Sequence, residues 1–135
     1  MKDIIETFGK SSGKVWNTLN KYGPLTQTSL IKYSGLAEND FYAAVGWLAR
    51  ENKIAKVGTK YQLSETNLTS KIGEDAGKIW NLLNSHGDCD ISLIATIHQI
   101  KVRDAYSALG WLAREDKIQM TKVRTKNKQI TFKLK

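Results

Sequence analysis

The stretch GWLARENKI at residues 46–54 decides the fold, because it returns as GWLAREDKI at residues 110–118. A second stretch, GKVWNTLN at residues 13–20, returns as GKIWNLLN at residues 77–84. Both pairs are separated by the same number of positions (110 − 46 = 64 and 77 − 13 = 64), so the two halves align without a gap. A constant offset across two long motifs indicates an internal duplication.

The duplication divides the chain into two parts. Between residues 9–54 and residues 73–118, 19 of the 46 aligned positions are identical, which chance does not produce at one offset. We place one domain at residues 1–64 and the other at residues 65–135, with the boundary in the polar stretch SETN. The chain of 135 residues is long enough for two very small domains.

Each copy predicts three helices followed by a β-hairpin. In the first copy, one helix ends at Gly23, a second begins at Thr26, and a third covers residues 38–53. The period then changes to that of strands, which predicts a hairpin over residues 54–63. The second copy repeats this order, with its third helix at residues 102–117 and a longer hairpin behind it. We therefore predict an α+β chain, mainly α, made of two tandem winged helix-turn-helix domains.

The repeated motifs also carry a family resemblance. GK[VI]WNxLN on the first helix, Tyr42 or Tyr106 on the third, and GWLARE at its end resemble an uncharacterised family of short bacterial and archaeal winged helix-turn-helix proteins. The resemblance covers nearly the whole chain, once per copy, and implies DNA binding by analogy with winged helices generally. Members of such a family are usually single copies, which we expect to pair. This chain is then expected to act as an intramolecular pseudo-dimer, or as a homo-oligomer.

The charge of the chain favours a polyanionic partner. Lys and Arg number 21 against 13 Asp and Glu, which gives a net charge of +8. Nucleic acid is the first candidate partner and an anionic membrane the second. The apolar runs are too short to span a bilayer and the start does not look like a signal peptide, so we expect a cytoplasmic protein. Of the two candidate partners, we predict nucleic acid and no membrane.

The third helices are the expected reading elements, because the recognition helix of a helix-turn-helix enters the major groove. The early residues expected to face the bases are Asn39 and Ala43 in the first copy, and Arg103 and Ser107 in the second. Arginine suits guanine and asparagine suits adenine. Asp40 would repel phosphate, so this surface predicts modest base contact only.

The GWLARE motif of each copy begins with a glycine and a tryptophan, which are Gly46/Trp47 and Gly110/Trp111. We predict that these residues form an interface. A surface of this kind suits packing against another protein element better than contact with phosphate. The partner element can be the other copy, the helix or wing of the same copy, or a separate protein.

The second hairpin is the most basic part of the chain. From Lys117 to Lys135 it carries seven basic residues and no acidic one, whereas the first wing offers Lys56 and Lys60. Long cationic side chains at a hairpin turn can reach phosphates, although lysines also protect solvated edge strands. The predicted phosphate contacts in the second wing are Lys122, Arg124, Lys126 and Lys128.

The sequence offers no pattern for catalysis. Its two histidines and its one cysteine, Cys89, do not recur between the copies and match no zinc spacing. We therefore expect no enzyme activity, no metal, no cofactor and no small-molecule substrate. The predicted function is binding of duplex DNA, in the manner of a transcription regulator. The alternative is a protein-interaction module in which the basic charge serves solubility.

Overall fold

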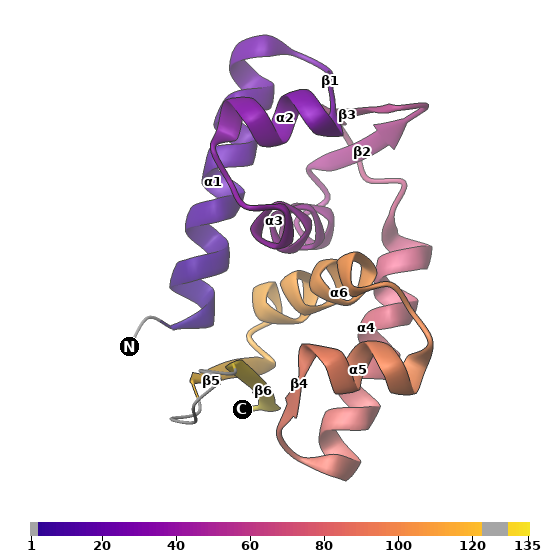
Figure 1. Cartoon of the computed structure of the whole chain (residues 1–135). Coiled ribbons are helices and arrows are strands. Elements are labelled where there is room, and N and C mark those ends of the chain that lie inside the picture. Colours follow the sequence, from indigo (N-terminus) through magenta and orange to yellow (C-terminus); the bar gives the residue numbers. More distant parts are fainter. Residues whose placement is uncertain (1–2, 123–129) are drawn as a thin grey trace.

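The computed structural model describes residues 3–122 and 130–135, and within them each copy has three helices and a three-stranded sheet (Figure 1). The first copy comprises α1 (Ile4–Tyr22), β1 (Leu25–Thr26), α2 (Gln27–Ser34), α3 (Glu38–Arg50), β2 (Ile54–Val57) and β3 (Lys60–Leu63). The second comprises α4 (Thr69–His86), β4 (Cys89–Asp90), α5 (Ile91–His98), α6 (Val102–Arg114), β5 (Ile118–Lys122) and β6 (Ile130–Leu134). The predicted fold, two tandem winged helix-turn-helix domains, is confirmed.

Local chemistry explains where the second helices begin. The side chain of Thr26 accepts a hydrogen bond from the Ser29 amide at 3.3 Å, and that of Asp90 accepts one from the Leu93 amide at 2.8 Å. Each satisfies an amide that has no partner inside the helix. Both caps agree with the sequence prediction.

The third helices are three residues shorter than predicted. They end at Arg50 and Arg114, because Asn52 and Asp116 adopt the left-handed conformation, with φ of 60° and 59°. Asn and Asp tolerate this conformation better than most residues, and it turns the chain from the helix into the wing.

Each wing hairpin is extended by a short strand that the sequence did not predict. The strand orders are β1-β3-β2 and β4-β6-β5, all antiparallel. Leu25 pairs with Tyr61 in the first sheet and Cys89 with Phe132 in the second. Two-residue strands carry too little alternation to be recognised in a sequence. They attach the root of each wing to the start of its helix-turn-helix.

The two copies pack through their third helices around an approximate two-fold axis. In Figure 1 a half-turn in the plane of the picture carries α1, α2 and α3 onto α4, α5 and α6. At the centre, Gly46 lies against the backbone of Ser107 and Gly110 against the backbone of Ala43. These are the same pair of positions taken twice (46 + 64 = 110 and 43 + 64 = 107), as a two-fold contact requires.

The hydrophobic cores cross from one copy to the other. Ile4 and Phe8, at the start of α1, belong to a cluster of buried side chains that, apart from Ala43 of α3, is otherwise built from the second copy. In return Ile72, on α4, lies in the cluster of the first copy. Each copy therefore completes the other's core, and the pair forms one packed body.

Candidate functional site

The middle of each third helix is not available to a ligand. Eight of the 13 residues of α3 are buried, and the exposed ones lie at its two ends. Asn39 and Arg103, predicted to face the bases, are exposed at the starts of α3 and α6. Ser107 is not: the structure buries it in the contact with Gly46, at 7% exposure, so the expectation that it faces a base is corrected. Its small side chain lets the two helices approach closely.

The contact between α3 and α6 also limits how a duplex could be read. Paired helix-turn-helix units that read two half-sites place their recognition helices about 34 Å apart, one turn of DNA. Here the two helices touch through their backbones at Gly46 and Gly110. In this arrangement they cannot enter successive major grooves.

The repeated tryptophans lie between the two copies and their own first helices. The ring of Trp47 lies 3.4 Å from the position of a Cβ on Gly9 of α1, and Arg114 of the second copy lies over it at 5.8 Å. Arg114 also pairs with Glu51 at 2.9 Å. The equivalent contacts recur in the second copy. The ring of Trp111 lies beside Gly73 of α4, and Arg50 lies over that ring. Arg50 also pairs with Glu115 at 3.1 Å.

The first wing presents its predicted phosphate contacts to solvent. Lys56 and Lys60 are exposed, and the ammonium of Lys56 lies 5.6 Å from the ring centre of Tyr61. In the second wing, the predicted contacts Arg124, Lys126 and Lys128 lie outside the described residues, and so does the side chain of Lys122.

A groove of about 240 Å³ joins the first wing to the start of α6; we call it the inter-copy groove. Lys56 and Tyr61 line it from the first copy, and Lys71, Arg103 and Asp104 from the second. Lys71 is held on the buried carboxylate of Asp75 at 2.8 Å, and this hydrogen bond raises the pKa of Lys71. The structure therefore brings together Lys56 and Arg103, which the sequence had placed in separate surfaces.

Tyr61, which lines this groove, makes the stability of the fold sensitive to alkaline pH. Burial, assisted by neighbouring Tyr42, raises the pKa of Tyr61 to about 12 from 10.0. A phenol whose pKa is raised by folding contributes stability that is complete below pH 10 and is lost as pH rises towards 12. We expect the loss to be on the order of 2 kcal/mol. Urea unfolding at pH 9 and at pH 12 measures it, and Tyr61→Phe should remove that part of the difference.

The family of the chain follows from its match to known proteins. A family model described as winged helix-turn-helix domain (DUF2582) matches the chain twice, over residues 1–66 and residues 65–134. The chain belongs to the DUF2582 family. The predicted resemblance to a winged helix-turn-helix family, present here in tandem, is confirmed.

Two further proteins are similar to this tandem DUF2582 chain. The uncharacterized protein MJ1608 of Methanocaldococcus jannaschii is 40% identical over 75 residues, which cover 51% of this chain and 97% of the relative. That relative is therefore about one DUF2582 copy long. The mRNA-binding domain of elongation factor SelB from E. coli, solved with SECIS RNA, has 17% identity and a TM-score of 0.35, covering 93% of this chain and 98% of that one. This similarity is too low to support an argument.

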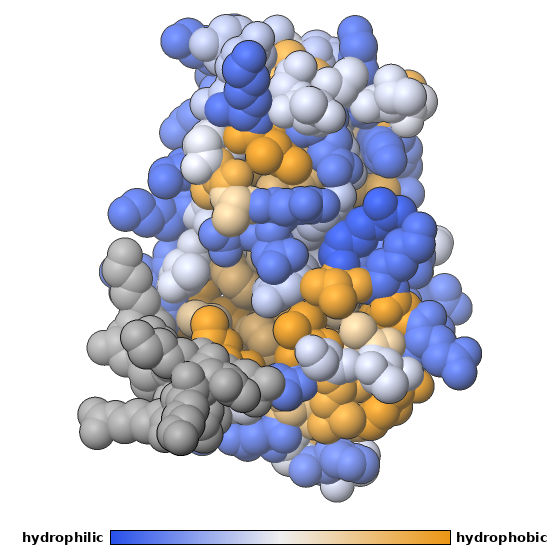
Figure 2. Space-filling view, in the orientation of Figure 1, coloured by the Kyte–Doolittle hydropathy of each residue, from blue (hydrophilic) through white to orange (hydrophobic). Residues whose placement is uncertain are grey.

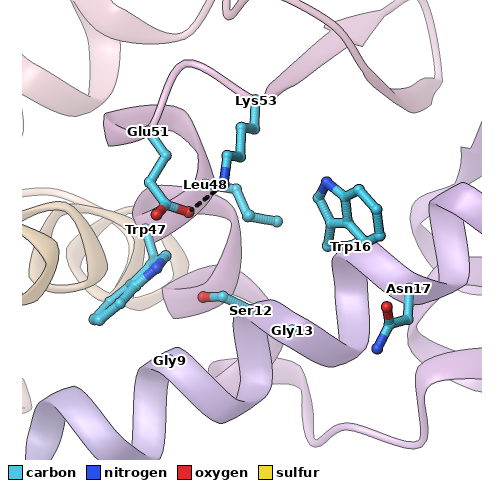
Figure 3. A pocket seen from close by; sticks show the side chains of 9 residues that line it. All are labelled: Gly9, Ser12, Gly13, Trp16, Asn17, Trp47, Leu48, Glu51 and Lys53. Atoms are coloured by element: carbon cyan, nitrogen blue, oxygen red, sulfur yellow. Dashed lines mark ion pairs between the residues drawn. The ribbon is translucent and has the colours of Figure 1, made fainter.

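Each DUF2582 copy also carries a groove that sequence reasoning missed; we call the two the wing-root grooves. They lie between the first and third helices, have volumes of about 220 and 350 Å³, and end at Lys53 and Lys117, directly before the wings. In Figure 3 the indoles of Trp16 and Trp47 stand on opposite sides of the first groove, with Gly13 between them on α1. The signal was present in the sequence, because Trp16 recurs as Trp80.

Two further properties bear on function. Within residues 3–122 and 130–135, no helix is both long and apolar enough to cross a membrane. In the same part of the chain, no three His, Cys, Asp or Glu side chains are grouped to hold a metal ion.

Proposed function

We propose that this protein is a non-enzymatic nucleic-acid-binding protein that binds duplex DNA, mainly through phosphate contacts. The observation that carries the proposal is the meeting of Lys56 and Arg103 in the inter-copy groove, with Lys60 exposed on the adjacent strand of the first wing. Winged helix domains are commonly nucleic-acid-binding, and the net charge of +8 suits a polyanion. We also propose separate phosphate contacts from the basic second wing, at Lys122, Arg124, Lys126 and Lys128.

The burial of α3 and α6 refines how such binding would work. Asn39 and Arg103 remain exposed at the helix starts, where they can reach a phosphate or one base edge. The central residues of both helices are buried, in the core of their own copy or in the contact between copies. We therefore propose binding with little sequence preference, and no reading of two half-sites.

The experiment is fluorescence anisotropy of the protein with a labelled random duplex over a salt series. The slope of log K against log salt counts neutralised phosphates at about −0.9 each. Charge reversal at Lys56 and Lys60 together should make the slope shallower by about 2, because two contacts are lost. A matched control is charge reversal at Lys14 and Lys78, which lie on the first helices and change the net charge equally.

Either of two results would contradict this proposal. If the duplex does not bind at low salt, or if both double variants weaken binding to the same extent, the wing lysines are only a solvated edge. The proposal is then wrong, and reversal of the second-wing residues Lys122, Arg124, Lys126 and Lys128 should also have no specific effect.

A protein-interaction module remains the second candidate, and one observation favours it. Figure 2 shows apolar surface gathered over α5 and the start of α6, where Leu93 and Ile97 of α5 and Val102 of α6 are 36%, 44% and 42% exposed. The first copy carries serine, tyrosine and glutamate at the equivalent positions, so the fold itself does not need this apolar face. Replacing Leu93 and Ile97 by the first-copy residues should leave duplex binding unchanged if the DNA proposal holds.

A further inference from the structure

The wing-root grooves keep nearly the same lining residues in both copies. Of the nine residues that line the first groove, eight are identical at the equivalent positions of the second; the ninth is Ser12, which becomes Ala76. The inter-copy groove differs in this respect. Only two of its 12 lining residues, Tyr42 and Asp104, keep their identity in the other copy. The wing-root grooves are therefore two equivalent sites.

The fold explains only part of this identity. Trp47 and Glu51 are needed for packing and for the ion pairs between copies. Gly13 has no such role: it lies inside α1, and a Cβ there would meet nothing within 4 Å. Glycine inside a helix is unfavourable relative to alanine, so its presence at both equivalent positions points to something outside the chain that approaches the backbone.

The exposed neighbours of Gly13 indicate the chemistry of that ligand. Trp16 is 37% exposed and Trp80, its equivalent, 36% exposed, and each stands beside an exposed asparagine. An indole face stacks on flat rings, and an amide donates to and accepts from the edge of a heterocycle. Glu51 is already paired with Arg114 and Lys53, so the surroundings of the groove are not repulsive to an anion.

We propose that each wing-root groove holds one unstacked base of a single-stranded nucleic acid. The base would stack on Trp16 or Trp80, lie against the bare helix backbone at Gly13 or Gly77, and be contacted by the adjacent asparagine. Each groove ends at the residue before a wing, so a strand whose phosphates follow the wing lysines can place a base there. This inference rests on the proposed nucleic-acid binding and assigns a site for bases.

The experiment measures tryptophan emission and anisotropy with a short labelled oligothymidylate, beside the random duplex used above. Wild type should bind the single strand with quenched emission and two sites per chain. Trp16→Ala and Trp80→Ala should each remove one site, and the double variant should bind about ten-fold more weakly or worse. Phenylalanine at both positions should restore much of the binding, because its ring still stacks.

Gly13→Ala with Gly77→Ala separates binding from folding. This double variant should raise Tm, because alanine favours the helix, while it weakens single-strand binding by filling the floor of both grooves. Loss of binding in a more stable protein cannot be attributed to misfolding.

The outcomes distinguish this inference from the proposed function. If the duplex binds, and the Trp16, Trp80 and glycine variants bind the single strand as well as the wild type does, the base sites are wrong and the proposed function stands. Loss of single-strand binding in those variants supports the base sites even if the duplex does not bind. If neither nucleic acid binds, both proposals are wrong; quenching by an oligoproline peptide in that case would assign the grooves to a protein partner.

Discussion

Replacing Gly46 by alanine is expected to lower the free energy of unfolding by about 3 kcal/mol, the upper part of the usual range for overpacking. A Cβ on Gly46 would overlap the backbone carbonyl of Ser107, and one on Gly110 would overlap that of Ala43. Backbone atoms cannot rotate away as a side chain can, so α3 and α6 must separate. Separation opens the contacts of Trp47 and Trp111 and exposes Ile4, Phe8 and Ile72 where each enters the core of the other copy.

Urea unfolding followed by circular dichroism measures this effect. The matched control is Gly13→Ala, the same substitution in the same helical setting but with open space beside it. It should stabilise the protein by about 0.5–1 kcal/mol. Opposite signs for two identical substitutions would locate the strain in the contact between copies, whereas similar small effects at both positions would contradict the close approach of α3 and α6.

Replacing Phe8 by alanine is expected to cost about 3–5 kcal/mol and to destabilise both copies together. Phe8 belongs to the first copy by sequence, yet it is 3% exposed within the core cluster built mainly by the second. Its removal leaves a cavity among side chains of α4 and α6. Because Ile72 completes the first core in the same way, neither copy can unfold without exposing the other.

Chemical unfolding should therefore give one cooperative transition in the wild type and in Phe8→Ala, shifted to lower denaturant without a second step. Val57→Ala, at a side chain 57% exposed on the first wing, serves as the control and should change stability by less than about 0.5 kcal/mol. Two separate transitions, with Phe8→Ala moving only the first, would show that the copies are independent domains.

The interlocked cores have a consequence for shorter relatives. The relative from Methanocaldococcus jannaschii is about one copy long, so it contains residues equivalent to only one half of this contact. In this chain the glycine and tryptophan of GWLARE face the second copy and the first helix of their own copy. The tandem arrangement supplies the second half within one chain, which removes the concentration dependence that pairing of separate copies would have.

The sequence alone determined the duplication, the order of elements and the fold of each copy. These are written in local signals: the constant offset between GWLARENKI and GWLAREDKI, the caps at Thr26 and Asp90, and the change of period after α3. Such signals act over a few residues, so they can be read along the chain. The two-residue strands β1 and β4 were missed because they are defined by pairing with distant partners.

Only the tertiary structure determined which residues are buried between the two copies and which ones line a common groove. Ser107 looks like an exposed base-reading residue in sequence, and it is buried because α6 packs on α3 of the other copy. Phe8 belongs to the first copy by its place in the sequence, and it packs in the core of the second. Lys56 and Arg103, 47 positions apart (103 − 56 = 47), line one groove. Helical periodicity tells which face of a helix is apolar, whereas the element that covers this face is set by the packing of the whole chain.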